Sequence, residues 1–233
     1  MSIMPITTLF LLQSLDGKIS TGDVDERDFD KDLPNIPGVK EGLRQYYEIE
    51  QQTDPVSFIS GRVMAKIGAN TNSLEGIKQI PVTFVVVDNK PHLAAHGVEF
   101  LARKFSKLLI VTTDKSHPAY GLQDQYANIV ILHYDKAIDF ADLFTKLKTE
   151  HSADRMTIQS GGELNAILLR AGLIDHVLIV VAPCLIGGRT TATLVDGEPL
   201  QSAEDLAKIR PLKLKSCKAL EDSYVRLEYE VTN

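Results

Sequence analysis

Short apolar runs rich in β-branched residues recur along this chain and constrain its fold more than any other feature. Each run is hydrophobic without alternation, which is typical of strands covered on both faces, as in parallel sheets. Amphipathic segments with helical spacing separate several of the runs. We predict strands at residues 6–12, 56–59, 82–87, 108–113, 129–132, 156–158 and 177–182.

Three segments have the periodicity of helices. In residues 140–150 four apolar side chains share one face, and Asp139 precedes them as an N-cap. Residues 163–171 repeat the pattern and stop at Gly172, a residue that favours a helix C-terminus. Residues 39–52 form a longer and weaker helix candidate.

After residue 200 the alternation of helix and strand stops. Residues 212–219 and 224–231 indicate two strands joined by a polar turn at 220–223, an antiparallel hairpin that often completes a mostly parallel sheet. Residues 21–38 form the one long polar stretch, which we interpret as a loop. We therefore expect a single α/β domain over residues 1–233.

The bulk composition excludes some classes of function. A net charge of −6 argues against broad nucleic-acid binding, which requires a basic surface. No stretch reaches the roughly 20 apolar residues of a membrane helix. The amino terminus lacks the basic region of a signal peptide, and Cys184 and Cys217 have no metal or disulfide spacing. We expect a soluble cytoplasmic protein.

A glycine pair, Gly161-Gly162, lies between a predicted strand and a predicted helix. The backbone N–H groups at a helix amino terminus favour an anion, and glycine lets a phosphate approach closely. The pair fits neither the GxGxxG dinucleotide pattern nor a P-loop. A tight turn is the simpler alternative for an isolated pair.

Two other stretches repeat the pattern of a strand followed by glycine. "QSLDGKIS" (residues 13–20) follows the first strand, and "FISGRVMAKIG" (residues 58–68) continues from the second into a helix start. Arg62 there has the donor geometry for a phosphate. A loop corner and a surface arginine are the alternatives for these two stretches.

Taken together, these three stretches and "GGELNAILLRAGLIDHVLIVVAPCLIGG" resemble the reductase domain of riboflavin biosynthesis, which shares its fold with dihydrofolate reductase. The resemblance implies a three-layer α/β fold with a mostly parallel central sheet and a C-terminal antiparallel hairpin. It also implies hydride transfer from NADPH to a heterocycle, most directly a pyrimidine carrying a phosphoribosylamino group, and a homodimer. Membrane and nucleic-acid partners are not expected.

The resemblance also implies roles for individual residues. It places Lys18 and Asp16 in catalysis and Ser14, Gly17 and Gln159 at the substrate, with Lys18 orienting the ribose or supplying the proton. It assigns the cofactor to Ser60, Gly61, Arg62, Val63, Asp88, Lys90, Thr112, Ser160, Gly161, Gly162, Glu163 and Leu164. An acidic residue such as Asp88 at a strand end can also indicate NADH, whereas Arg62 and Lys90 favour NADPH.

The substrate half of the pattern departs from the family. Gln159 stands where glutamate is usual, Arg62 and Lys66 replace a threonine and an aspartate, and the chain has no tryptophan. A dihydrofolate or pteridine reductase of the same fold therefore stays open as an alternative. So does a nucleotide-binding protein without turnover.

Three metal-like patterns are incomplete, so we expect no metal. His92 and His96 have zinc-pair spacing but lack the glutamate of HExxH, and Pro91 precedes them. The acidic residues 23–32 lack the glycine of a calcium loop. Pro183-Cys184 lacks the second cysteine of a zinc deaminase.

Overall fold

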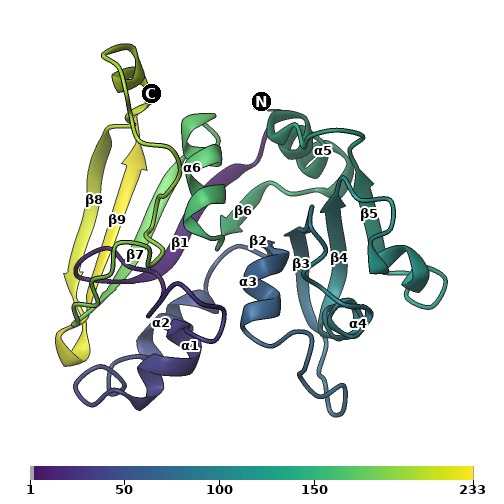
Figure 1. The fold of residues 1–233 in the computed structure, drawn as a ribbon, viewed down its shortest axis with the longest axis horizontal. Helices are drawn as coiled ribbons and strands as arrows, with labels where there is room; N and C mark the ends of the chain where they lie inside the picture. The colour runs from purple at the N-terminus through teal and green to yellow at the C-terminus, as the bar shows by residue number, and fades with distance from the viewer. Residues whose placement is uncertain (1–2, 233) are drawn as a thin grey trace. The chain divides into compact units, whose positions relative to one another are not determined.

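The computed structural model describes residues 3–232, and the chain forms two compact units (Figure 1). Unit 1 comprises Met1–Pro5 and Asp54–Ser160, and unit 2 comprises Ile6–Thr53 and Gly161–Asn233. Both units are α/β, as the strand and helix patterns predict. Among the helices of residues 3–232, none has the length and apolar character needed to cross a bilayer.

Unit 1 is built on five parallel strands in the order β5-β4-β3-β2-β6. The strands are β2 (Val56–Ser60), β3 (Ile80–Val87), β4 (Phe105–Thr112), β5 (Ile129–His133) and β6 (Arg155–Ile158). In a parallel sheet all carboxyl ends meet at one edge. The residues that follow β2, β3 and β4 are therefore neighbours, although about 50 residues of chain separate the first from the last.

Successive residues of these strands face opposite sides of the sheet, and both sides are apolar. Ile59, Phe84 and Val86 pack in one core with α3 (Gly61–Lys66) and α4 (Ala95–Lys104). Phe58 points the other way and meets Phe144 of α5 (Phe140–His151) edge-on, with ring centroids 5.5 Å apart. Helices thus cover both faces of the unit 1 sheet, which explains the unbroken hydrophobic runs.

Unit 2 combines parallel and antiparallel pairing. Its strands, in the order β1-β7-β9-β8, are β1 (Ile6–Ser14), β7 (His176–Ala182), β9 (Val225–Val231) and β8 (Leu212–Ala219). β1 and β7 run parallel, whereas β9 is antiparallel to both β7 and β8. The C-terminal hairpin predicted from the sequence is confirmed.

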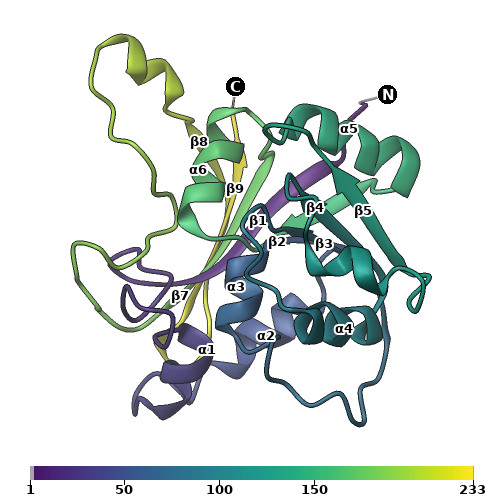
Figure 2. The same ribbon diagram turned by 45° about the vertical axis from the view of Figure 1, so that its right-hand side comes forward.

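The core of unit 2 packs β1 and β7 against two short helices, α1 (Phe29–Asp32) and α2 (Arg44–Glu50), which lie near each other in Figures 1 and 2. Phe10 of β1 stacks on Tyr46 of α2 at 5.0 Å. Tyr224 is fully buried in the same core, and its hydroxyl donates to the carbonyl of Val39 at 2.7 Å. α6 (Gly162–Arg170) precedes β7 and begins at the glycine pair.

The structure departs from the sequence prediction at two helices. The predicted helix at 39–52 begins only at Arg44, after a run of turns. Gly42 in these turns lies against the Tyr224 ring, where a Cβ would be 2.6 Å from it. α4 was not predicted. Its interior Gly97 weakens a helical pattern, but a Cβ there would lie 2.2 Å from the Asn70 side chain, so packing requires the glycine.

The polar stretch at 21–38 is less irregular than predicted. It contains α1 and a 3-10 turn, η1 (Leu33–Asn35), anchored by the buried side chains of Phe29 and Leu33. The Asp28 side chain accepts a hydrogen bond from the amide of Asp30 and caps α1. The buried side chains of Phe29 and Leu33 and the Asp28 cap help to order this segment.

Candidate functional site

The corner that follows β1 is formed by residues of the "SLDGK" stretch. Gly17 has a φ of +78°, a conformation that favours glycine, and its amide donates to the carbonyl of Ser14. The Ser14 hydroxyl is buried, donates to Asp16 Oδ1 at 2.5 Å and accepts from the Lys18 amide at 3.0 Å. The side chain of Ser14 thus holds both residues predicted to be catalytic.

Asp16 joins this corner to the loop after β7, the "APCLIGG" stretch. Its Oδ1 accepts the Ile186 amide at 3.1 Å and its Oδ2 accepts the Gly187 amide at 2.6 Å. Gly187 and Gly188 have φ values of +73° and +82°, so both glycines are required by the backbone of this loop. Two sequence motifs about 170 residues apart therefore form one structure in unit 2.

The hydrogen bonds to Asp16 stabilise its charged form. The Ser14 hydroxyl, followed by the amides of Gly187 and Ile186, lowers the pKa of Asp16 to about 2. Asp16 is consequently ionised throughout the neutral range. Its carboxylate is an anchor for the backbone and does not supply a proton at neutral pH.

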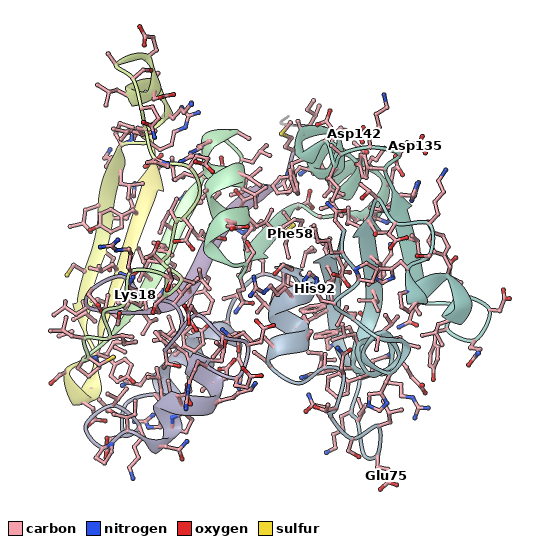
Figure 3. All side chains as sticks on the ribbon, in the orientation of Figure 1. Lys18, Phe58, Glu75, His92, Asp135 and Asp142 are labelled. Carbon is pink, nitrogen blue, oxygen red and sulfur yellow. The ribbon has the colours of Figure 1, made fainter. Side chains whose placement is uncertain are left out.

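Lys18 is held by the same loop. Its ammonium donates to the carbonyls of Gly188 at 2.7 Å and Thr191 at 2.9 Å, and its backbone forms a β-bridge with Thr193. An ammonium has three N–H donors, and these contacts use two of them. Lys18, labelled in Figure 3, thus has one N–H beyond these two contacts.

The glycine pair has two different structural roles. Gly161 is the N-cap residue of α6, with an ordinary extended conformation and no side chain capping the helix within the described residues. Gly162 is buried against the loop from Thr193 to Asp196, where a Cβ would lie 2.3 Å from a carboxylate oxygen of Asp196. The protein's own loop therefore demands glycine at 162.

Glu163 and Leu164 complete the first turn of α6. Glu163 is exposed, and Leu164 is half-buried. The first-turn amides of a helix lack partners within the helix, and here no side chain caps them. This amino terminus is chemically suited to a phosphate.

A second cluster lies in unit 1 at the carboxyl ends of β2, β3 and β4. After β2, the Ser60 hydroxyl caps α3 by accepting the amide of Val63, and Arg62 is exposed in the first turn. Gly61 lies against Asp88, at the end of β3, so closely that a Cβ would be 2.3 Å from its carboxyl carbon. Glycine at 61 is thus required by Asp88.

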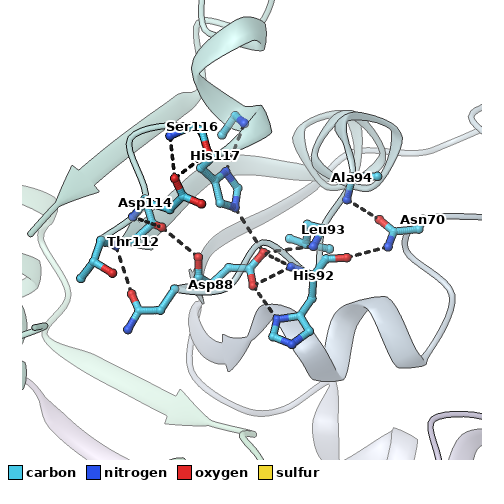
Figure 4. A network of polar contacts seen from close by, with 12 residues as sticks. Asn70, Asp88, His92, Leu93, Ala94, Thr112, Asp114, Ser116 and His117 are labelled. Atoms are coloured by element: carbon cyan, nitrogen blue, oxygen red, sulfur yellow. Dashed lines mark hydrogen bonds and ion pairs between the residues drawn. The ribbon is translucent and has the colours of Figure 1, made fainter.

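Asp88 is the centre of this cluster (Figure 4). Its carboxylate is buried and accepts the amides of His92 and Leu93, the ring of His92 at 3.0 Å and the ring of His117 at 3.2 Å. Burial alone would raise the pKa of Asp88, but the hydrogen bonds from His117, Leu93 and His92 outweigh it and lower the pKa. Direct contact of this carboxylate with a cofactor stays a prediction, and it requires some of these bonds to open.

His117 was not singled out by sequence analysis. It is fully buried, and its Nδ1 accepts the Ala119 amide at 3.1 Å while Nε2 faces Asp88. Since Nδ1 accepts a hydrogen bond, the proton is on Nε2, and the ring is neutral and donates to Asp88. No sequence pattern linked His117 to Asp88, 29 positions earlier.

Thr112 supports the same cluster from the end of β4. It is buried, its hydroxyl donates to the Asp88 carbonyl at 2.9 Å and accepts the Asp114 amide at 3.1 Å. Lys90, by contrast, is exposed on the loop after β3. Among the predicted cofactor residues of unit 1, Asp88 and Thr112 are therefore buried and bonded inside the protein. Arg62 and Lys90 are exposed.

Gln159 and Ser160 end unit 1, directly before Gly161. The Gln159 amide donates to the Phe58 carbonyl at 2.9 Å, and the Ser57 hydroxyl lies 3.4 Å from Gln159 Oε1. Ser160 is buried. The neutral amide of Gln159 hydrogen-bonds where a glutamate would carry charge.

The described residues contain no group of three or more metal-binding side chains. His92 and His96, which have zinc-pair spacing, face different partners. His92 contacts Asp88, and His96 Nε2 lies 2.8 Å from the carbonyl of Asn72. The spacing on its own does not bring the two rings to one point.

Comparisons with known proteins show the family of this chain. Residues 5–225 match the family described as the RibD C-terminal domain. The chain is 26% identical over 232 residues to a 2,5-diamino-6-ribosylamino-4(3H)-pyrimidinone 5′-phosphate reductase from Methanothermobacter thermautotrophicus, covering 97% of this chain and 98% of that protein.

Solved structures share the fold. A RibD structure from Acinetobacter baumannii superposes with a TM-score of 0.69 at 17% identity, covering 99% of this chain and 59% of that one. The riboflavin biosynthesis reductase Rib7 of Saccharomyces cerevisiae gives 0.62 at 19% identity, covering 100% and 92%. The chain thus spans about three-fifths of the RibD protein but nearly all of the yeast reductase.

The Asp16 contacts predict a pH-dependent contribution to stability. The pKa of Asp16 is about 2 in the folded protein, below about 3.9 in an unfolded chain, so the stabilisation is complete above about pH 5 and decreases as the pH falls toward 2. We expect Asp16→Asn to lower the free energy of unfolding by about 1 kcal/mol at pH 6, because solvent screens the contacts of this exposed carboxylate. The loss should be smaller at pH 3, as measured by urea denaturation.

Asp124→Asn is the matched control, because Asp124 is exposed and its side chain forms no hydrogen bond or ion pair with the described residues. It should change the free energy of unfolding by less than about 0.5 kcal/mol at both pH values. Equal losses for Asp16→Asn at pH 6 and pH 3 would contradict the assigned role of its charge.

Proposed function

Because the chain belongs to the RibD C-terminal domain family, we propose that it reduces a phosphoribosylaminopyrimidine with NADPH. It is an oxidoreductase of the riboflavin-biosynthesis type. The observation that carries the proposal is the match over 97% of this chain and 98% of the archaeal pyrimidinone reductase. The Asp16–Lys18 corner supplies the polar groups that this reduction requires.

When bound, the nicotinamide would supply a hydride. The acceptor is C1 of the substrate's ribose, and as the hydride arrives the sugar ring opens, its ring oxygen takes a proton, and a ribitylamine results. The protein must orient the sugar, exclude water and provide that proton. Lys18 has one N–H left after its two carbonyl contacts, and we assign it to the ribose oxygen.

Each of the two units has groups that suit NADPH. In unit 2, the uncapped first turn of α6 at Gly161 can receive the pyrophosphate through its backbone N–H groups. In unit 1, the strand ends carry Arg62 and Lys90 as outward cationic side chains. A homodimer and a cytoplasmic location belong to the same proposal.

The substrate test compares three heterocycles with the purified chain and NADPH, followed by the loss of NADPH absorbance. We expect turnover of the diaminopyrimidinone ribosylamine phosphate, the compound named for the archaeal relative. The deaminated uracil analogue is the second candidate, and dihydrofolate should be inert. Oxidation of dihydrofolate alone would identify a folate-type reductase, and binding without any oxidation would identify a nucleotide-binding protein.

Gly161→Asp should abolish NADPH binding. The φ of −72° and ψ of 160° at Gly161 suit any residue, and aspartate at an N-cap accepts the helix amides while its charge repels a phosphate. We expect at least a hundredfold loss of NADPH affinity by fluorescence titration, with the melting temperature retained. Gly161→Ala, which adds neither charge nor cap, is the control and should bind within a few-fold of wild type.

Lys18→Gln should lower kcat by at least about a hundredfold, the usual contribution of a general acid. NADPH affinity should be unchanged, because the effect concerns the sugar. Lys18→Arg keeps a cation and its donors and should recover part of the rate. Lys31→Gln, at an exposed lysine on α1, is the control; a kcat for Lys18→Gln equal to that of this control would exclude Lys18 from the reaction.

A further inference from the structure

Residues 188–196 continue from the "APCLIGG" stretch and belong to unit 2. The proposed function leaves this segment without a role of its own. Its first part holds the Lys18 ammonium, which donates to the carbonyls of Gly188 at 2.7 Å and Thr191 at 2.9 Å. Both acceptors are backbone groups, so the position of the ammonium depends on the path of the main chain through this segment.

The middle of the segment pairs with the corner after β1. Lys18 and Thr193 form an antiparallel bridge. The Ile19 amide donates to the carbonyl of Ala192 at 3.0 Å, and the Leu194 amide donates to the carbonyl of the residue before Lys18 at 3.2 Å. A displacement of residues 191–194 therefore displaces both the backbone and the side chain of Lys18.

The far end of the segment is fixed to α6. Asn165 of this helix is fully buried, and its Nδ2 donates to the Leu194 carbonyl at 2.8 Å. The Asp196 amide donates to the Gly162 carbonyl at 3.0 Å, and the Asp196 carboxylate fills the space where a Cβ of Gly162 would lie. A buried amide without a partner is costly, so the bond from Asn165 favours one position of residue 194.

A pair of side chains, Thr193 and Asp196, closes this end of the segment. The Thr193 hydroxyl donates to Asp196 Oδ1 at 2.5 Å, and the Thr193 amide donates to the same oxygen at 3.1 Å. Thr193 is bridged to Lys18, and Asp196 packs on Gly162 at the start of α6. The pair thus connects the corner after β1 to the amino terminus of α6 across only four residues.

The proposed reaction requires these two places to be fixed relative to each other. The amino terminus of α6 is assigned to the pyrophosphate, and Lys18 is assigned to the ribose oxygen. A displacement of about 1 Å between reacting groups can cost about a hundredfold in rate. A lysine ammonium stands on a flexible four-carbon stem, so its place must be set by the groups that surround it.

We propose that Asn165 and the Thr193–Asp196 pair are positioning residues that place the Lys18 ammonium relative to the amino terminus of α6. They act through the backbone of residues 191–194, which carries the acceptors and the bridge of Lys18. This inference rests on the proposed function and adds a connection between two of its assignments. Loosening residues 191–194 frees Lys18 and leaves α6 in place.

The first test follows Lys18 in the protein without ligands. The variants are acetylated with a small N-hydroxysuccinimide ester, and mass spectrometry of peptides gives the rate at each lysine. Thr193→Val removes the hydroxyl donor and keeps the shape of the side chain. We expect Lys18 to react about fivefold faster in this variant, as for the loss of one hydrogen bond. Lys40, which is exposed in the same unit, should react at the wild-type rate.

Thr193→Ser keeps the hydroxyl and should restore the wild-type labelling rate of Lys18. Thr149→Val is the matched control, because it removes an exposed hydroxyl that donates within α5 of unit 1, and it should leave this rate unchanged. Asn165→Leu should accelerate the labelling by a similar factor, and the Thr193 variants decide if it does not fold. Equal rates for Thr193→Val and Thr193→Ser overturn the inference.

The second test separates the positioning of Lys18 from cofactor binding. We expect Thr193→Val to lower kcat for the pyrimidine about tenfold, because a misplaced group slows the reaction more than it weakens binding. The Kd of this variant for NADPH, measured by fluorescence titration, should stay within about twofold of the wild-type value. A loss of NADPH affinity as large as the loss of kcat assigns the pair to the cofactor helix alone and overturns the inference.

The two tests together distinguish this inference from the proposed function. Faster labelling of Lys18 in Thr193→Val, with no reduction of a pyrimidine by the wild type, supports the placement of the lysine and contradicts the reaction. Pyrimidine reduction by the wild type, with Thr193→Val equal to it in both kcat and labelling, has the opposite meaning: the reaction stands and the inference is overturned.

Discussion

Among the described residues of unit 1, Asp88 is the buried carboxylate on which the arrangement of the strand ends depends. A carboxylate removed from water is costly unless donors surround it, and at Asp88 those donors come from the chain's own loops. Satisfying that charge fixes the loop after β3 through His92 and Leu93 and the loop after β4 through His117. It also requires a glycine at 61, where α3 begins. The hydrogen bonding and packing of one buried carboxylate thus fix the chain at three strand ends.

Unit 2 also holds charged side chains with backbone groups of its loops, but these side chains are exposed to solvent. Asp16 and Lys18 are partly or fully exposed, and each is held by backbone groups of the loop after β7. Exposure makes each contact individually modest, but together they join two segments about 170 residues apart. Because the acid of this pair has a pKa of about 2, it holds its charge and its anchoring role at any physiological pH.

In both arrangements the charged groups are held by the protein's own loops. The supports are buried or bonded internally, as at Asp88, Thr112 and Gly162, so they depend on packing within the protein. Lys90, by contrast, is exposed on the loop after β3.

Much of the fold and part of the site follow from local sequence. Unbroken β-branched runs can be covered only on both faces, which determines parallel strands, and the hairpin after residue 200 follows from its turn residues. The corner at 14–18 was also visible, since the positive φ of Gly17 favours glycine locally. The glycine pair was visible only as a pattern between a strand and a helix.

What the sequence could not determine are the partners that folding brings together. Nothing near Gly162 reveals that Asp196 will fill the space of its missing side chain, and nothing near Asp88 points to His117. Helix α4 was missed for the same reason, because its Gly97 is unfavourable locally and is required only by contact with Asn70. By itself the sequence determined which segments become strands and where the chain turns. The tertiary structure alone decided which groups hydrogen-bond the buried carboxylate of Asp88, since that depends on distances between residues far apart in the chain.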